Sequence, residues 1–269
     1  MKRLQLRQVS PDLPCNLLLL VLLLVSPGVS AQEISSPPNF VGSGARALGM
    51  GGAFIAVADD ATAASWNPGG LTQLERPEIS MVWSWKFYED DFRTGQQYWP
   101  EGTDEINLSQ LNYLSVVYPF RRTLAGRNLV LSLNYQRKFD FDRNIDGIVN
   151  LLGFGVLQQQ DIHFQQRGSL GALSPAFGFE VTDRLSIGLV ANIWNQSLVP
   201  TNKWEKVLRT NSWSTIGGMV TANQFVQKET FEDFEGVNYT FGVLYKPTER
   251  LSLGAVYHTK FAADVKYTL

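Results

Sequence analysis

Cysteine and histidine are scarce in this sequence, which has one cysteine, Cys15, and two histidines, His163 and His258. Cys15 lies in a leader that we expect to be cleaved off, so the mature chain would have no thiol. Disulfide frameworks, thiolate metal sites and cysteine nucleophiles are therefore excluded. The sequence predicts no metal site, no cofactor and no enzymatic activity.

An excess of basic residues is also lacking. The chain has 23 Lys and Arg against 25 Asp and Glu. Removal of residues 1–31 takes away Lys2, Arg3, Arg7 and Asp12 and leaves 20 basic against 24 acidic residues, a net charge of −4. Nucleic-acid binding needs a basic surface, so we expect no nucleic-acid partner.

Long hydrophobic runs are absent except for "NLLLLVLLLVS" near the start. This run follows a basic N-terminus and precedes the small residues "VSA", a pattern typical of an export signal that is cleaved after Ala31. The run is about half of the roughly 20 residues that a membrane-spanning helix needs. We therefore expect residues 1–31 to be a signal peptide.

The rest of the sequence contains segments in which apolar and polar residues alternate, which predicts β-strands with one apolar face. Four clear segments begin at Glu78, Leu129, Leu185 and Leu251, and "VNYTFGVLYK" is a fifth. Two weaker segments, "QLNYLSVVYPF" and "LGALSPAFGFEV", bring the number to seven. Each is close to the 9 to 11 residues with which a tilted strand crosses a bilayer.

The connections between these segments differ strongly in length. "VTDR", "KPTER" and "RRTLAGRN" are short, whereas residues 89–109, 142–167 and 199–236 are predicted as long polar loops, with room for one short helix in "DGIVNLLGFGVLQQQ". Short turns at one end and long loops at the other are typical of an antiparallel outer-membrane β-barrel. Aromatic residues near the segment ends suit its interfaces: Trp83, Trp85, Phe87, Tyr118, Phe120, Tyr245 and Tyr257. The alternative is a soluble β-sandwich, whose strands also alternate.

The stretch "GARALGMGGAFIAVADDATAASWNPGG", residues 44–70, has a different character, since 16 of its residues are Gly, Ala, Ser or Thr. A wide barrel needs a plug, and such a segment could turn tightly inside it. We expect residues 32–76 to form this plug and residues 77–269 the barrel. Asp59, Asp60 and Asn67 would hydrogen-bond to the polar inner wall, and Asn67-Pro68 would make a turn.

This stretch resembles the N-terminal hatch of the FadL/TodX family of outer-membrane transporters for long-chain fatty acids and other hydrophobic compounds. Asn67 and Pro68 match the family's Asn-Pro-Ala turn, and Gly69 stands where alanine is usual. "LYKPTERLSLGAVYHTKFAADVKYTL" also resembles a mid-barrel hairpin of that family. Hatch-like openings occur as well in barrels of the PorV type, which serve a protein secretion system.

The resemblance implies a 14-stranded barrel in the outer membrane of a Gram-negative-type bacterium. Its external loops capture fatty acids or aromatic hydrocarbons, and a shift of the hatch opens a path through a gap in the wall. Hatch gating would then involve Asn67, Pro68, Gly69, Asp59 and Asp60. Its other partners would be outer-membrane lipid and the barrel assembly machinery. Apolar loop residues would contact the ligand or, alternatively, cap the barrel mouth: Ile148, Val149, Leu151, Leu152, Phe154, Val156 and Leu157.

Seven strands make only half of such a barrel, and an open sheet edge in lipid leaves backbone groups unpaired. We therefore expect this sequence to be the first half of a longer protein. Closure by two chains is an alternative.

Three other patterns favour structure over chemistry. "GSGARALGMGG" lacks the spacing of a dinucleotide-binding loop. "DRNIDG" matches the start of a calcium loop, but Gly153 stands at the twelfth position, where a bidentate Glu is needed, so a solvated loop is favoured. His163, with Ser169 and Asp161, would suit a barrel lipid hydrolase only if the three met in space. Transport of hydrophobic compounds is therefore the first hypothesis, a PorV-like scaffold the second and a lipid hydrolase the third.

Overall fold

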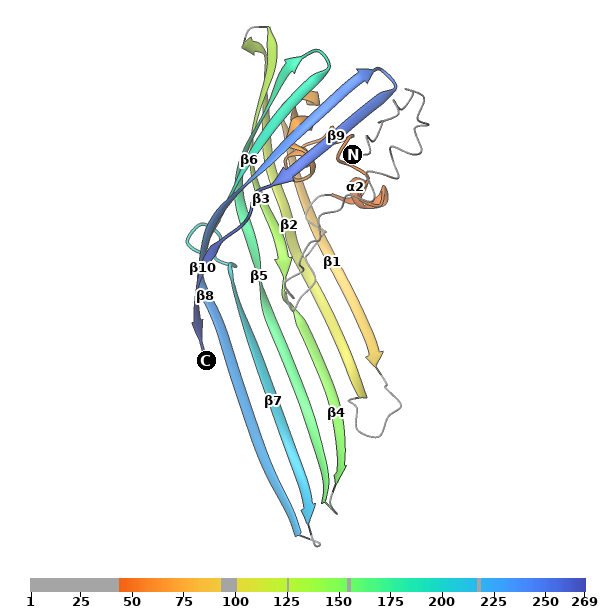
Figure 1. The fold of residues 1–269 in the computed structure, drawn as a ribbon, viewed down its shortest axis with the longest axis vertical. Coiled ribbons are helices and arrows are strands. Elements are labelled where there is room, and N and C mark those ends of the chain that lie inside the picture. Colours follow the sequence, from red (N-terminus) through yellow and green to blue (C-terminus); the bar gives the residue numbers. More distant parts are fainter. Residues whose placement is uncertain (1–43, 93–100, 125, 154–155, 217–218) are drawn as a thin grey trace, which may run out of the picture. The chain divides into compact units, whose positions relative to one another are not determined.

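The computed structural model describes residues 44–92, 101–124, 126–153, 156–216 and 219–269. They form one antiparallel β-sheet preceded by short helical turns, which confirms the all-β fold (Figure 1). The helical elements are α2 (Ala45–Gly49), α3 (Ala63–Trp66) and the 3-10 helix η2 (Pro68–Gln73). The strands are β1 (Glu78–Phe92), β2 (Glu101–Leu124), β3 (Arg127–Asp140), β4 (Arg143–Gly153), β5 (Val156–Thr182), β6 (Leu185–Asn195), β7 (Lys203–Ile216), β8 (Met219–Thr248), β9 (Leu251–His258) and β10 (Ala263–Thr268).

Several of the ten strands are consecutive parts of one longer column. β3 and β4 both pair with β5, one after the other along its length. In the same way, β6 and β7 share the partners β5 and β8, and β9 and β10 share β8. The described sheet therefore has seven columns, and each of the seven predicted segments lies in a different one.

The two ends of the sheet differ as the short and long connections predicted, but the long connections are not loops. The short connections, between Leu124 and Arg127 and at residues 183–184 and 249–250, lie at one end, which we call the turn end. At the other, the hairpin end, the chain continues as β-hairpins through most of residues 89–109, 142–167 and 199–236. The loop prediction and the short helix were wrong because polar side chains on both faces weaken the alternation while the backbone still pairs.

The sheet has one face covered by the N-terminal segment and one face left open. Residues 44–74, which we call the docked segment, pack on the covered face, where small and polar side chains are buried, among them Ser115, Ser132, Asn134, Ser174, Ser186, Asn192 and Thr240. The open face carries the apolar rows that the alternation predicted. One of these rows crosses six columns in register: Tyr118, Leu131, Phe177, Leu189, Phe241 and Tyr257.

The hydrophobic core lies between the docked segment and the covered face. Phe54 and Leu71 of the segment are fully buried and pack in one cluster with Val117, Val130 and Val190 of the sheet. This contact explains why so irregular a segment holds a defined structure, since its few large side chains find a wall to pack against. No helix in the described ranges has the length and apolar character needed to cross a membrane.

Candidate functional site

A row of glycines on the covered face receives the docked segment. Gly178, Gly188 and Gly242 are register neighbours on β5, β6 and β8. A Cβ atom at Gly188 would lie 2.2 Å from the carbonyl carbon of Pro68, and one at Gly242 would lie 2.2 Å from Oδ1 of Asn67. The backbone of the Asn-Pro-Gly turn therefore touches the sheet at a distance that only glycine allows.

Asn67 fastens this turn to the sheet. Its side chain is fully buried, and Nδ2 donates to the carbonyl oxygens of Ile55 at 2.8 Å and Val243 at 2.9 Å. Its Oδ1 accepts a hydrogen bond from the Gly69 amide at 3.0 Å, so the same side chain also closes the turn. Asn67 thus joins two parts of the docked segment to β8.

Gly69 also lies close to the covered face of the sheet. A Cβ atom there would come 3.0 Å from the Leu244 amide nitrogen and 3.1 Å from the Ser186 carbonyl oxygen. An alanine would fit only after a shift of a few tenths of an ångström. The turn packs closely between β6 and β8, which agrees with glycine at position 69.

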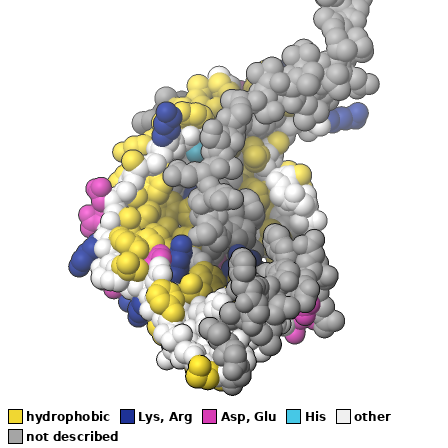
Figure 2. Space-filling view, turned by 60° about the horizontal axis from the view of Figure 1, so that its bottom comes forward, with side chains coloured by type: hydrophobic (Ala, Val, Ile, Leu, Met, Phe, Trp, Pro, Cys, Tyr) yellow, Lys and Arg dark blue, Asp and Glu magenta, His cyan; other side chains and the backbone are white. Residues whose placement is uncertain are grey.

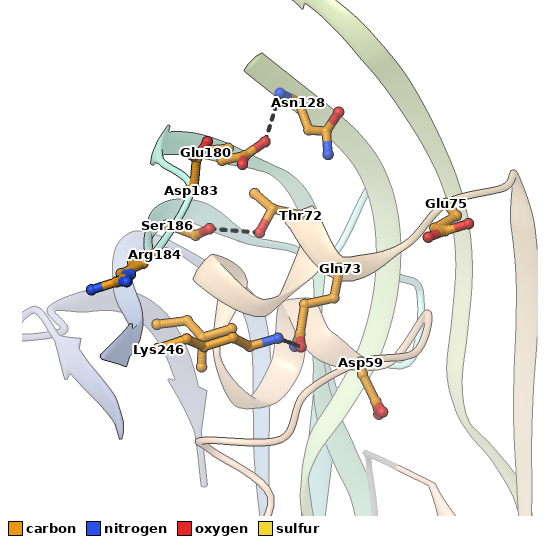
Figure 3. A pocket seen from close by; sticks show the side chains of 11 residues that line it. Asp59, Thr72, Gln73, Glu75, Asn128, Glu180, Asp183, Arg184, Ser186 and Lys246 are labelled. Atoms are coloured by element: carbon orange, nitrogen blue, oxygen red, sulfur yellow. Dashed lines mark hydrogen bonds between the residues drawn. The ribbon is translucent and has the colours of Figure 1, made fainter. Parts of the chain in front are cut away.

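Further hydrogen bonds fix the segment on either side of the turn. Tyr113 Oη and Ser115 Oγ of β2 both donate to the carbonyl oxygen of Ala61, at 3.1 and 2.9 Å. Near the turn end, the Thr72 hydroxyl bonds to that of Ser186 on β6 at 2.8 Å, and Lys246 Nζ of β8 donates to Gln73 Oε1 at 2.6 Å (Figure 3). The segment is therefore held by β2, β6 and β8 together.

Asp59 and Asp60 do not hold the segment to the wall, as the sequence had led us to expect. Asp59 pairs with Arg46 at 2.6 Å, and Asp60 Oδ1 accepts hydrogen bonds from the amide and hydroxyl of Thr62. The hydrogen bonds that the structure gives these carboxylates thus stay within the docked segment. They stabilise its turns, because carboxylates next to a free backbone amide cap it locally.

A polar cavity of about 470 Å³ borders the docked segment at the turn end (Figure 3). Its charged lining residues are Asp59, Glu75, Glu180, Asp183, Arg184 and Lys246. The Thr72–Ser186 and Gln73–Lys246 hydrogen bonds lie in this lining. The contacts that hold the segment are thus reachable from the turn end.

An interruption in backbone pairing separates β2 from the column formed by β3 and β4. Tyr113 pairs with Gln136 of β3, and Glu105 pairs with Asn144 of β4. Between these points, residues 106–112 face residues 137–143 without a ladder in the described strands. We call this interruption the window. Its border at Tyr113 is also where β2 holds Ala61 of the docked segment.

Side chains bridge the window where the backbone does not. Arg137 Nη1 donates to Gln110 Oε1 at 2.7 Å, and Gln110 Nε2 donates to Asp140 Oδ2 at 2.5 Å. Nearer the hairpin end, Arg143 Nε donates to Asp104 Oδ2 at 2.9 Å. These bonds span the two columns, so polar side chains and not the β-ladder hold the window shut.

The bridge leaves buried polar atoms without a partner. Among the described residues, Asp104 Oδ1, Asp140 Oδ1, Arg137 Nε and Gln166 Oε1 are buried with no hydrogen-bond partner. Gln166, which is 1% exposed, also lines a cavity of about 340 Å³ with Asp142 and Arg143. Unpartnered buried polar atoms cost free energy, so we expect the pairing of β2 with the β3–β4 column to be less stable at the window than where a continuous ladder joins them.

An aromatic cluster on the covered face was not predicted from the sequence. Trp194 of β6 and Phe234 of β8 are buried there, and Trp204 of β7 stacks on Phe231 with ring centroids 4.5 Å apart. The other aromatic members are Phe139, Phe141 and Phe261. These residues come from different columns and meet only through the register. The sequence signal that could have revealed them is that aromatic residues stand next to the points where one strand of a column ends and the next begins, between β3 and β4, β6 and β7, and β9 and β10.

The hydrophobic residues predicted to contact ligand lie in the hairpin formed by β4 and β5. Leu151, Leu152, Val156 and Leu157 belong to its strands, and Phe154 falls outside the described residues, as do the side chains of the other four. Ile148 is 45% exposed on β4. Their contact with ligand stays a prediction.

The calcium and hydrolase patterns are not assembled by the structure. Residues 143–153 form strand β4, paired along its whole length with β5, and not the coiled loop that calcium needs. The described residues contain no group of three metal-ligating side chains. His163 Nδ1 lies 2.5 Å from Asp146 Oδ1, while the Ser169 hydroxyl bonds to the Thr201 carbonyl oxygen, so these groups form no catalytic chain.

Comparison with known proteins gives no relative, since no family profile, curated protein or solved structure matches the chain.

Proposed function

We propose that this chain forms the hatch and part of the wall of an outer-membrane β-barrel that transports fatty acids or other hydrophobic compounds. The observation that carries the proposal is the distribution of side chains over the two faces of the sheet. The covered face buries many Ser, Asn and Thr side chains beside the apolar residues that pack on the docked segment, whereas the open face carries exposed apolar rows, a distribution typical of a transmembrane barrel.

The open face is too apolar to be left in water. Leu133 is 52% exposed, Phe241 46% and Ile79 76%, and the rows to which they belong continue across the sheet. On the surface turned to the viewer in Figure 2, hydrophobic side chains gather in patches and charged residues lie mostly toward the edge. Apolar patches of this extent mark contact with lipid or with another protein. Lipid is the better partner because the rows follow every column from the turn end.

The covered face has the character of a barrel interior. Asn134 Nδ2 donates to the Ser174 carbonyl oxygen at 2.7 Å, the Ser174 hydroxyl bonds to Asn192 at 2.9 Å, and Asn192 bonds to Thr240 at 3.2 Å. This chain of polar contacts crosses four columns. The docked segment lies on the same face, as a hatch that fills a polar interior would.

The aromatic cluster and the window supply the remaining parts of a route for hydrophobic molecules. The cluster offers buried rings on the covered face. The window interrupts the wall beside the point where β2 holds the docked segment. A hydrophobic compound would enter at the hairpin end, rest against the rings and leave through the window when the hatch shifts.

The test is uptake of labelled long-chain fatty acid by cells that express the gene, compared with cells that carry the empty vector. We expect uptake well above the vector level for the wild type, a several-fold change for Asn67→Ala, and wild-type uptake for Asn211→Ala. Asn211 is a matched control because its hydrogen-bond partner, Gln224, is also exposed and far from the hatch along the sheet.

Uptake at the vector level with the protein present in the outer membrane would refute transport. A secreted protein that co-purifies with such a barrel would favour the PorV-like alternative. Recovery of the chain in the soluble fraction without detergent would refute the barrel itself.

A further inference from the structure

We propose that Asp140 and Asp142 form a proton-operated clasp that closes the window between β2 and the β3–β4 column. The clasp regulates the route that we proposed above and rests on that function only for its biological purpose. Its opening and closing are properties of the wall and can be measured without transport.

The geometry places the two carboxyl groups at the weakest point of the wall. β3 ends at Asp140 and β4 begins at Arg143, so Asp142 lies in the short break between them. Asp140 accepts the hydrogen bond by which Gln110 of β2 reaches across the window. Asp142 is within hydrogen-bonding reach of Asp140 and lines the cavity beside the window. A change of charge on this pair therefore acts directly on the bridge.

Asp142 can hold a proton near neutral pH. Burial raises the pKa of the Asp142 carboxyl to about 7, helped by its hydrogen bond to Asp140 and by the negative charge there. The Gly168 backbone and the charge of Arg137 oppose this effect. The other charged groups at the window are Asp104 and Glu105 of β2, Arg143 of β4 and Arg167 of β5. The charge of Arg137 does not outweigh burial, so the Asp142 carboxyl holds its proton at mildly acidic pH.

The direction of the switch follows from the raised pKa. Because the clasped state binds the proton more tightly than a solvated carboxyl with its usual pKa of 3.8, acid favours the clasped state. This advantage is complete below pH 4 and is lost as the pH rises through about 7. Above that pH two adjacent negative charges repel each other in a half-buried site, and the polar atoms left unpartnered in the bridge regain water when the window opens.

The test measures the width of the window as a function of pH. Asn107→Cys on β2 and Gln165→Cys on β5, both in the lining of the cavity and outside the bridge, are introduced together with Cys15→Ser. Spin labels on this pair report an electron–electron distance in the full chain, purified in detergent. We expect a short, narrow distance distribution at pH 5 and a longer one at pH 8, with a midpoint near pH 7.

Asp142→Asn removes the titrating charge and should keep the short distance at both pH values. The matched control is Asp146→Asn, which removes a carboxyl from β4 that faces His163 and not the window, and it should keep the wild-type response. Heat-modifiable mobility on a gel establishes that each variant is folded.

An identical distance at pH 5 and pH 8 in the wild type would overturn the clasp, and so would a full pH response in Asp142→Asn. Loss of the response in Asp146→Asn would assign the titration to His163 instead and would equally overturn it. None of these results affects the transport proposal, which fails only if fatty-acid uptake stays at the vector level.

Discussion

Gly188→Ala tests whether the glycine row is the seat of the docked segment. The new Cβ atom would lie 2.2 Å from the carbonyl carbon of Pro68 and 2.4 Å from its oxygen, whereas ordinary contact begins at 3.4 Å. The segment would have to move by more than 1 Å. It cannot do so while Asn67 holds Val243, so the substitution should weaken docking.

The size of the effect follows from two opposing contributions. Overpacking of a rigid contact destabilises by about 3 kcal/mol. Replacement of glycine by alanine inside a strand returns roughly 0.5–1 kcal/mol through the lower entropy of the unfolded chain. The net loss is about 2 kcal/mol, which corresponds to a roughly 30-fold lower ratio of docked to undocked segment.

Amide hydrogen exchange of residues 61–73 measures this ratio, because these amides exchange when the segment leaves the wall. We expect exchange roughly 30-fold faster in Gly188→Ala than in the wild type. Gly49→Ala is the control, since a Cβ atom there has no neighbour within 4 Å, and its exchange should be unchanged. Equal exchange in Gly188→Ala and the wild type would refute the close contact on which the docking argument rests.

Three further substitutions probe the same face. Asn67→Ala removes the buried side chain that joins the segment to Val243 and should destabilise docking by about 3 kcal/mol, seen as faster exchange of residues 61–73; wild-type exchange would contradict it. Tyr113→Phe removes the hydroxyl that bonds to the Ala61 carbonyl oxygen and to Asn134 Oδ1, and should cost about 1–2 kcal/mol in the same assay, because Ser115 still donates to Ala61; an effect as large as that of Asn67→Ala would show that the window border matters more than we infer. Trp194→Ala empties the centre of the aromatic cluster and should lower the free energy of unfolding by about 3–5 kcal/mol, measured by urea titration in detergent, with a much smaller loss for Trp194→Phe; equal losses would place the importance in the indole hydrogen bond to Asn238.

The strands near the turn end could be read from the sequence because their two faces differ in polarity. Leu129, Leu131 and Leu133 alternate with Val130, Ser132 and Asn134, and this alternation is a local property of the chain. The same property failed for the hairpin end, where β7 and the first half of β8 carry polar residues on both faces. There the backbone ladder continues although the two faces do not differ in polarity, and a ladder leaves no mark in the sequence.

The candidate site was partly predictable for the same reason. The Asn67-Pro68 turn is a local signal, and the structure places Asn67 against the wall as expected. Asp59 and Asp60 carry the same polar groups but turn back onto the docked segment, a choice that depends on where Arg46 and Thr62 lie. Hydrogen-bonding capacity can be read from a residue type, whereas the partner is set by the fold.

The sequence by itself determined the class of the sheet, the number of its columns, the position of the short turns and the polar turn of the small-residue segment. These features arise from alternation and from glycine and proline, which act over a few residues. Only the tertiary structure decided the glycine row under Pro68, the window between β2 and the β3–β4 column, and the aromatic cluster around Trp194. Each of these depends on the register between strands far apart in the chain, and register is fixed by the packing of whole faces and not by any local stretch.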